Sequence, residues 1–185
     1  MLQWFTQRRS RHQAAQKIYD SIVGQARHPT FYGALGVGDR LEARFELLVL
    51  HVFLVLDRLQ RDGSDGAAIG QELVDAFVRD MDTTLRELGV GDLSVPKKVR
   101  LTAAVFHDRL QDYRKALAVT DQGPLEATLE RYVFSDPDPR PESTVQLAAY
   151  TRAAALRLNN QKLGEISSGR IDFPEPVREL DGSSP

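Results

Sequence analysis

The residues best suited to chemistry in this chain are two histidines and the acidic residues that could join them. His51 lies inside a long apolar segment, and His107 is followed directly by Asp108. Imidazole nitrogens and carboxylate oxygens together bind divalent metals. Asp121 or Asp136 would supply a further carboxylate. A shared metal site is therefore one chemical hypothesis for this chain.

Structural roles explain the same residues with fewer assumptions. A His-Asp pair arises often by chance, and a histidine on a buried helix is more commonly a hydrogen-bonded core residue. We therefore predict no catalytic residues, no metal and no cofactor. The less favoured alternative is a helical metal-dependent phosphohydrolase that uses His51, His107 and Asp108.

The sequence Gly-Val-Gly-Asp occurs twice, at residues 36–39 and 89–92. A phosphate-binding loop needs a preceding strand and a Gly-Lys-Ser/Thr ending, and neither copy has them. Helix corners are the better interpretation. Gly89 stands where a helix commonly ends in a left-handed residue, and Asp39 with Glu42 would cap the start of the next helix.

Composition excludes several classes of protein. The chain has 185 residues, 42% of them hydrophobic, which is enough for one core. Its net charge of −2 argues against DNA or RNA as the main partner. It has no cysteine, which excludes disulfides and thiol chemistry. The longest apolar run, Phe45–Leu56, is shorter than the roughly 20 residues of a membrane span and contains Glu46 and His51.

Hydrophobic periodicity predicts an all-α, single-domain bundle of about six helices. They are expected at about 10–27, 39–59, 67–88 and 95–119, from near Pro124, and at about 142–163. The segment 41–59 is apolar on nearly all sides, so it should be the central helix. The predicted organisation is a basic extension at 1–9, a helical domain at 10–163, and an extended or disordered tail at 164–185.

Two basic regions stand out in this slightly acidic chain. The N-terminus holds Trp4, Arg8, Arg9 and Arg11, which fit a membrane-surface or ribosome-surface contact as well as they fit a solvated terminus. The segment 95–119 carries six basic and two acidic side chains. Either it offers a surface for an anionic partner, or nearby acids neutralise it.

Several segments of the chain, taken in their order along the sequence, resemble the ubiquinol–cytochrome c chaperone family. This family comprises assembly factors for the cytochrome bc1 complex. The resemblance begins in "ARFELLVLHVFLVLDRLQ", with its Leu-His inside an apolar helix. It continues through "LEATLERYVF" and the segment 150–152 to the tail "GEISSGRIDFPEP". It covers about residues 16–176.

The resemblance implies a non-enzymatic all-α chaperone that binds newly made cytochrome b for the respiratory chain. It also implies a small partner protein and a place near the ribosome. The positions that match the family pattern are candidates for client or partner binding: His51, Asp82, Arg86, Lys97, Lys98, Phe106 and Tyr113. Asp82 and Arg86 also fit an i,i+4 pair on a solvated helix face.

No convincing mitochondrial transit segment is visible, so we expect a bacterial cytoplasmic protein, peripheral at the inner face of the membrane. A groove beside the basic helix is expected to shield apolar client segments. The alternative in the same class is a general helical interaction module at the membrane surface with another client.

Overall fold

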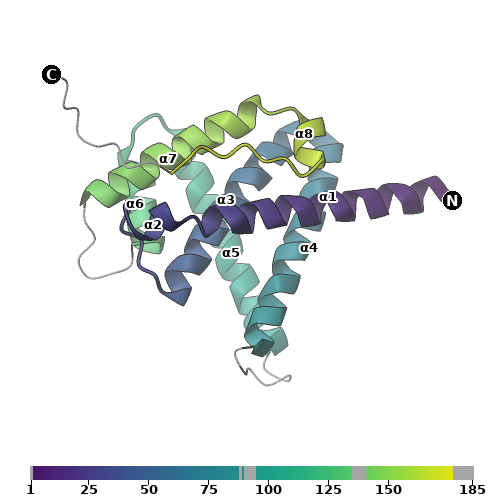
Figure 1. Ribbon diagram of the computed structural model, residues 1–185, viewed down its shortest axis with the longest axis horizontal. Coiled ribbons are helices and arrows are strands. Elements are labelled where there is room, and N and C mark those ends of the chain that lie inside the picture. Colours follow the sequence, from purple (N-terminus) through teal and green to yellow (C-terminus); the bar gives the residue numbers. More distant parts are fainter. Residues whose placement is uncertain (1, 88, 90–94, 135–140, 177–185) are drawn as a thin grey trace.

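The computed structural model describes residues 2–87, 89, 95–134 and 141–176, with side chains in these ranges except at 2–8 and 95–99 (Figure 1). Its helices are α1 (Leu2–Ala26), α2 (Pro29–Tyr32), α3 (Leu41–Leu59), α4 (Gly63–Glu87), α5 (Val95–Ala118), α6 (Gly123–Tyr132), α7 (Pro141–Asn160) and α8 (Leu163–Ser167). A 3-10 turn, η1 (Gln60–Asp62), joins α3 to α4. These ranges contain no strand, so the all-α prediction is confirmed. Six of the helices have ten or more residues.

Helix α3 is the centre of the fold, as its sequence predicts. Thirteen of its 19 residues are buried. It packs against α1, α4, α5 and α7. Leu47, Leu50 and Phe53 are wholly buried, and each such side chain stabilises the fold by about 1.5–3 kcal/mol. None of the helices in the described ranges combines the length and hydrophobicity that a membrane span requires.

Charged residues on α3 are bonded to neighbouring elements. Glu46 is buried, and both of its carboxylate oxygens accept hydrogen bonds of 2.8 Å from Nε of Arg109 on α5. Arg58 is also buried and donates to the backbone oxygen of Leu158 at the end of α7, at 2.8 Å. Arg58 pairs in addition with Asp62 in η1. These contacts fix the position of α3 along α5 and α7.

The first helix begins at Leu2 rather than near Ser10. The residues that the sequence suggests as a separate basic extension therefore continue α1, which projects beyond the body of the bundle (Figure 1). The physical reason is that no proline or glycine interrupts this helix before Gly24, and helices propagate readily once they have formed.

Part of the C-terminal tail is packed rather than free. Residues Ser168–Pro176 follow α8 without helical structure, and Phe173 lies against the core. The Gln25 side chain on α1 donates to the backbone oxygen of Pro174 at 3.1 Å, and Ser21 donates to that of Gly169 at 3.1 Å. The sequence predicts an extended or disordered tail from residue 164, whereas the structure has the short helix α8 at its start and packed, non-helical residues after it. The sequence does not reveal this packing because the partners on α1 are about 150 residues away.

One of the two predicted corners is confirmed. Gly89 has a φ of 78°, and its N–H donates to the backbone oxygen of Arg86 at 3.0 Å, so it ends α4 as predicted. The predicted cap at Asp39 is wrong, because α3 begins at Leu41 without a side-chain cap. The Asp39 carboxylate accepts from Nε of Arg44 at 2.6 Å instead.

We predict that Glu46→Ala lowers the free energy of unfolding by about 3 kcal/mol, because it leaves the part-buried Arg109 guanidinium without its carboxylate. Urea unfolding followed by circular dichroism measures the change. The matched control is Asp39→Ala, which breaks the exposed pair with Arg44 and should leave stability almost unchanged. Similar losses in the two variants would contradict the central role of the Glu46–Arg109 pair.

Candidate functional site

His51 is a core histidine with both ring nitrogens bonded to the protein. It is wholly buried, with Nδ1 at 2.7 Å from the Leu47 backbone oxygen and Nε2 at 2.8 Å from the Tyr150 hydroxyl oxygen. Because the carbonyl only accepts, Nδ1 carries the proton and Nε2 accepts from Tyr150. The Gln25 side chain in turn donates to the Tyr150 oxygen at 3.0 Å. This chain of bonds joins α3, α7 and α1.

Burial lowers the pKa of His51 to about 4, and the bond to the Leu47 carbonyl opposes this shift only in part. The ring also contacts the aromatic rings of Phe31 and Phe173, at centroid distances of 5.4 and 5.2 Å. His51 is therefore a neutral structural residue, sealed from solvent. Neither of its nitrogens is available to a metal.

His107 and Asp108 are exposed on α5, whereas His51 is wholly buried on α3. In the ranges that the structure describes, no group of three or more His, Asp or Glu side chains is arranged to hold a metal ion. Asp136 lies outside the described residues. The geometry therefore does not support the hypothetical metal site of His51, His107 and Asp108.

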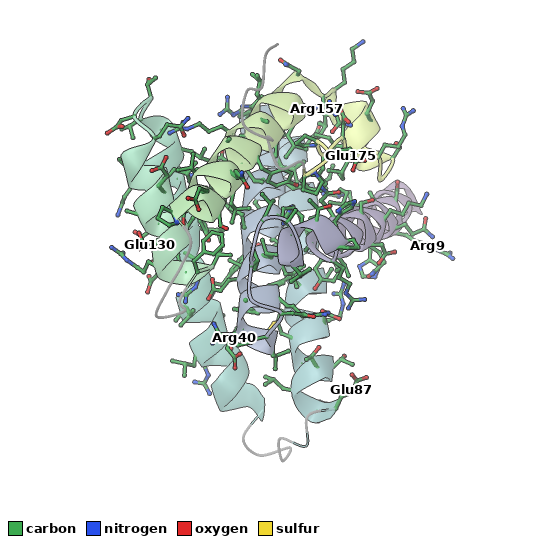
Figure 2. All side chains as sticks on the ribbon, turned by 60° about the vertical axis from the view of Figure 1, so that its left-hand side comes forward. Arg9, Arg40, Glu87, Glu130, Arg157 and Glu175 are labelled. Atoms are coloured by element: carbon green, nitrogen blue, oxygen red, sulfur yellow. The ribbon has the colours of Figure 1, made fainter. Side chains whose placement is uncertain are left out.

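The charged candidates do not gather into one site. Asp82 and Arg86 form the i,i+4 pair on α4, at 2.7 Å. The structure does not describe the side chains of four further candidates, which are Trp4, Arg8, Lys97 and Lys98. Arg9 is exposed near the outer end of α1, and Arg11 is half-buried (Figure 2).

Two of the basic residues on α5 are paired with acids from α3. Arg109 binds Glu46, and Arg114 lies 3.2 Å from Asp57. Arg109 also lies over the ring of Tyr132, 4.3 Å from its centroid. Much of the positive charge at this end of α5 is therefore neutralised within the fold, which favours the second of the two interpretations of the basic segment.

Phe106 and Tyr113 are core residues on α5. Phe106 lies 4.7 Å from Phe77 of α4, and Tyr113 stacks on Phe53 of α3 at 5.4 Å, measured between ring centroids. Burial, and then the nearby Glu46 carboxylate, raise the pKa of the Tyr113 hydroxyl well above its usual value. Both aromatic residues hold α5 in place, and Phe106 also borders a pocket described below.

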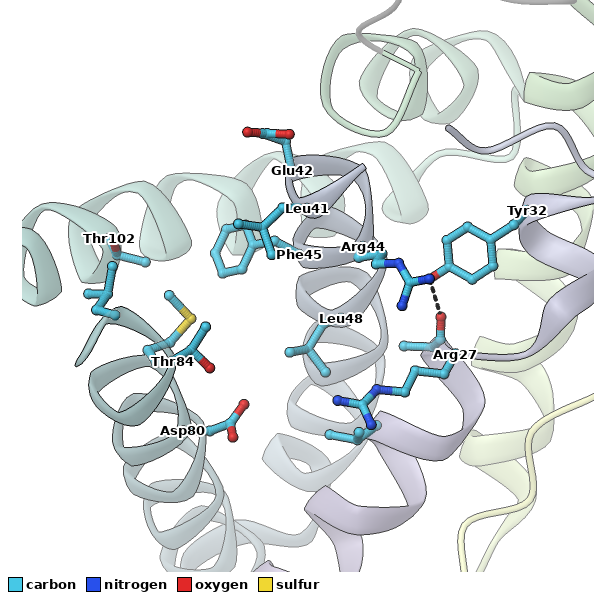
Figure 3. A pocket seen from close by; sticks show the side chains of 14 residues that line it. Arg27, Tyr32, Leu41, Glu42, Arg44, Phe45, Leu48, Asp80, Thr84 and Thr102 are labelled. Carbon is cyan, nitrogen blue, oxygen red and sulfur yellow. Dashed lines mark hydrogen bonds between the residues drawn. The ribbon is translucent and has the colours of Figure 1, made fainter. Parts of the chain in front are cut away.

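An open pocket lies where α1, α3 and α4 meet, and Figure 3 shows the side chains that line it. We call it the α3–α4 pocket, and its volume is about 430 Å³. Its walls are mainly apolar, formed by Val23, Leu41, Phe45, Leu48, Met81 and Leu85. Leu41 is 55% exposed, although it follows the periodicity of the core. The volume is within the range of binding pockets for small molecules or a few side chains.

A smaller pocket of about 270 Å³ lies between α4 and α5 and is bordered by Phe77, Phe106 and His107. The two pockets share Met81 and Thr102, so they adjoin. The structure thus has apolar hollows beside α5, as expected from the sequence. Among the sequence candidates, Phe106 and His107 border the smaller pocket, but the sequence did not single out the lining of the α3–α4 pocket, because an apolar stripe looks the same whether it is covered or open.

A model of the family described as ubiquinol–cytochrome C chaperone matches residues 33–173, which include α3, the smaller pocket and the α3 and α4 walls of the α3–α4 pocket. The chain belongs to this family. Its helical architecture is also that of a solved relative, the Cbp3 homolog from Brucella abortus. The two chains superpose with a TM-score of 0.84 at 32% identity, over 95% of this chain and 97% of the other. The suspected resemblance is confirmed.

Curated relatives carry the name ubiquinol–cytochrome c reductase complex assembly factor 1. The human protein is 25% identical over 178 residues, which are 93% of this chain and 59% of the human protein. The mouse protein is 25% identical over 139 residues, which are 75% of this chain and 47% of the mouse protein. The chain therefore spans only about half to three fifths of the length of these mammalian relatives.

The neutral His51 predicts a pH dependence of stability. The unfolded histidine gains its proton near pH 6.5, whereas the folded one gains it only near pH 4. Between these values the unfolded chain binds more protons, so acidification favours unfolding. Between pH 7 and 4.5 we expect the protein to lose about 2–3 kcal/mol more than His51→Gln does. Urea unfolding at each pH measures this difference, and parallel losses in the two proteins would disprove it.

Proposed function

We propose that this protein is an assembly chaperone for ubiquinol–cytochrome c reductase, the bc1 complex, and that its client is newly made cytochrome b. The observation that supports this most directly is the family match, which extends over α3 and over the α3 and α4 walls of the pocket beside it. The relatives named as assembly factors for the same complex support the choice of complex. The choice of cytochrome b follows from the resemblance seen in the sequence.

The physical mechanism that we propose is temporary covering of apolar client surface. In the α3–α4 pocket, apolar side chains remain accessible to solvent, including the exposed Leu41 and the half-buried Leu48. An apolar segment of the client would lose contact with water there until its own partner subunits replace the chaperone. Such a role requires binding and release, without a chemical reaction, so we infer that the protein is not an enzyme.

The remaining proposals concern where the protein acts and what accompanies it. We propose a peripheral position at the inner face of the bacterial cytoplasmic membrane, with a small partner protein and the ribosome or membrane surface as further contacts. The N-terminal part of α1, with Trp4, Arg8, Arg9 and Arg11, is the candidate for the surface contact. Asp82, Arg86, Lys97 and Lys98 remain candidates for partner binding.

Deletion of the gene in its host tests the function. We expect a selective loss of cytochrome b polypeptide and of its b-haem absorbance in the membranes, with other cytochromes unchanged. Immunoblots and difference spectra measure the two quantities. Unchanged cytochrome b in the deletion strain would contradict the proposed function.

Complementation links the function to the pocket. Leu41→Glu changes an exposed leucine in the α3–α4 pocket, and Leu156→Glu changes one on α7, outside both pockets; the two side chains are 55% and 64% exposed. The wild-type gene and Leu156→Glu should restore cytochrome b, whereas Leu41→Glu should not. Equal restoration by both variants would remove the pocket from the mechanism.

A further inference from the structure

The α3–α4 pocket has a carboxylate and a guanidinium on facing walls. Asp80 extends from α4 and Arg27 from the turn that directly follows α1, and Figure 3 shows both side chains directed toward the space between them. The Asp80 carboxylate accepts a 2.8 Å hydrogen bond from the hydroxyl of Tyr19, which orients it. No ion pair joins Asp80 and Arg27 to each other or to another described side chain. The other arginine of the pocket, Arg44, is already paired with Asp39.

The length of the pocket limits what it can cover. Its wall on α3 runs from Leu41 to Leu48, which is about 10 Å, or two helical turns. The apolar part of a membrane-spanning helix is about 30 Å long. The pocket is therefore too short for a whole span, and it suits the last turns of one.

A helix end has a polar chemistry of its own. At a C-terminal end the last four backbone carbonyls lack donors, and lysine or arginine is favoured nearby. Membrane-spanning helices also carry an excess of lysine and arginine at one end. Arg27 can donate to free carbonyls, and Asp80 can accept from a cation, so a basic C-terminal end satisfies both walls. A basic N-terminal end would instead bring N–H donors and cations next to Arg27. This is unfavourable, because the guanidinium is itself a cation with only donors.

We propose that the α3–α4 pocket binds the C-terminal end of an apolar client helix that is flanked by lysine or arginine. The last two turns lie on Leu41, Phe45 and Leu48, the free carbonyls face Arg27, and the cation pairs with Asp80. This inference rests on the proposed function for the nature of the client. It goes further because it fixes which end of the helix is bound and its direction in the pocket.

Two stapled peptides of equal composition test the direction of binding. Each has about 15 residues with one apolar face, because shorter helices are marginal in water. One carries Lys-Arg at its C-terminal end and the other at its N-terminal end, and both have blocked termini. Fluorescence anisotropy with the purified full chain should show that the first peptide binds about three- to tenfold more tightly.

Variants of the chain identify the groups responsible. Asp80→Asn keeps an acceptor for Tyr19 but removes the charge, and Arg27→Gln removes the guanidinium; each should abolish the preference between the two peptides. Met81→Glu, on the wall shared by both pockets, should weaken both peptides. Leu156→Glu is the control and should bind like the wild type. Circular dichroism shows whether each variant is folded.

Equal or reversed affinities for the two peptides would overturn the proposal, and so would a preference that survives Asp80→Asn. Failure of both peptides to bind the wild type at millimolar concentration would overturn it as well. The result is distinct from that of the gene deletion. Directional binding with unchanged cytochrome b in the deletion strain would support the pocket assignment and refute the choice of client.

Discussion

The fold depends on one constraint, which is that α3 has almost no side that tolerates water. A helix that is apolar nearly all round needs neighbours in every direction, and α1, α4, α5 and α7 provide them. The same burial forces each polar group on α3 to find a partner. Glu46 finds Arg109 on α5, His51 finds Tyr150 on α7, and Arg58 finds backbone oxygens at the end of α7. Since an unpaired buried polar group is costly, these bonds set the positions of the surrounding helices.

The α3–α4 pocket occurs where neighbouring helices cover the apolar surface of α3 only in part. Later turns of α3 are sealed, as at Phe53 and Val55, whereas Leu41 near its start is 55% exposed and Phe45 and Leu48 are half-buried. The first turns of α3 therefore leave apolar surface that the chain itself does not cover. Two side chains of opposite charge, Asp80 and Arg27, border that surface from facing walls of the pocket. Apolar surface with a few oriented polar groups is the usual composition of a recognition site.

The family match and the geometry bear on different parts of the function. The match joins this chain to chaperones of ubiquinol–cytochrome c reductase, and the Brucella abortus neighbour shows the same architecture over nearly its whole length. Neither tells which side chains meet the client. The geometry narrows that choice, because His51 and Tyr113 are wholly buried and serve the fold, whereas Phe106 is buried but also borders the smaller pocket. The exposed residues of the α3–α4 pocket, such as Leu41, are those that another molecule can reach.

The sequence by itself determined the helical class, the central helix, the corner at Gly89 and the family, because periodicity and local conformational preference act over a few residues. It also indicated that His51 is a core residue. The tertiary structure alone decided the cap of α3, the packing of residues 168–176 on α1 and the location of the pockets. These features depend on side chains far apart in the chain, such as Gln25 with Pro174 or Asp80 with Tyr19. Whether an apolar stripe is covered or open depends on how neighbouring helices pack, and no local pattern records that.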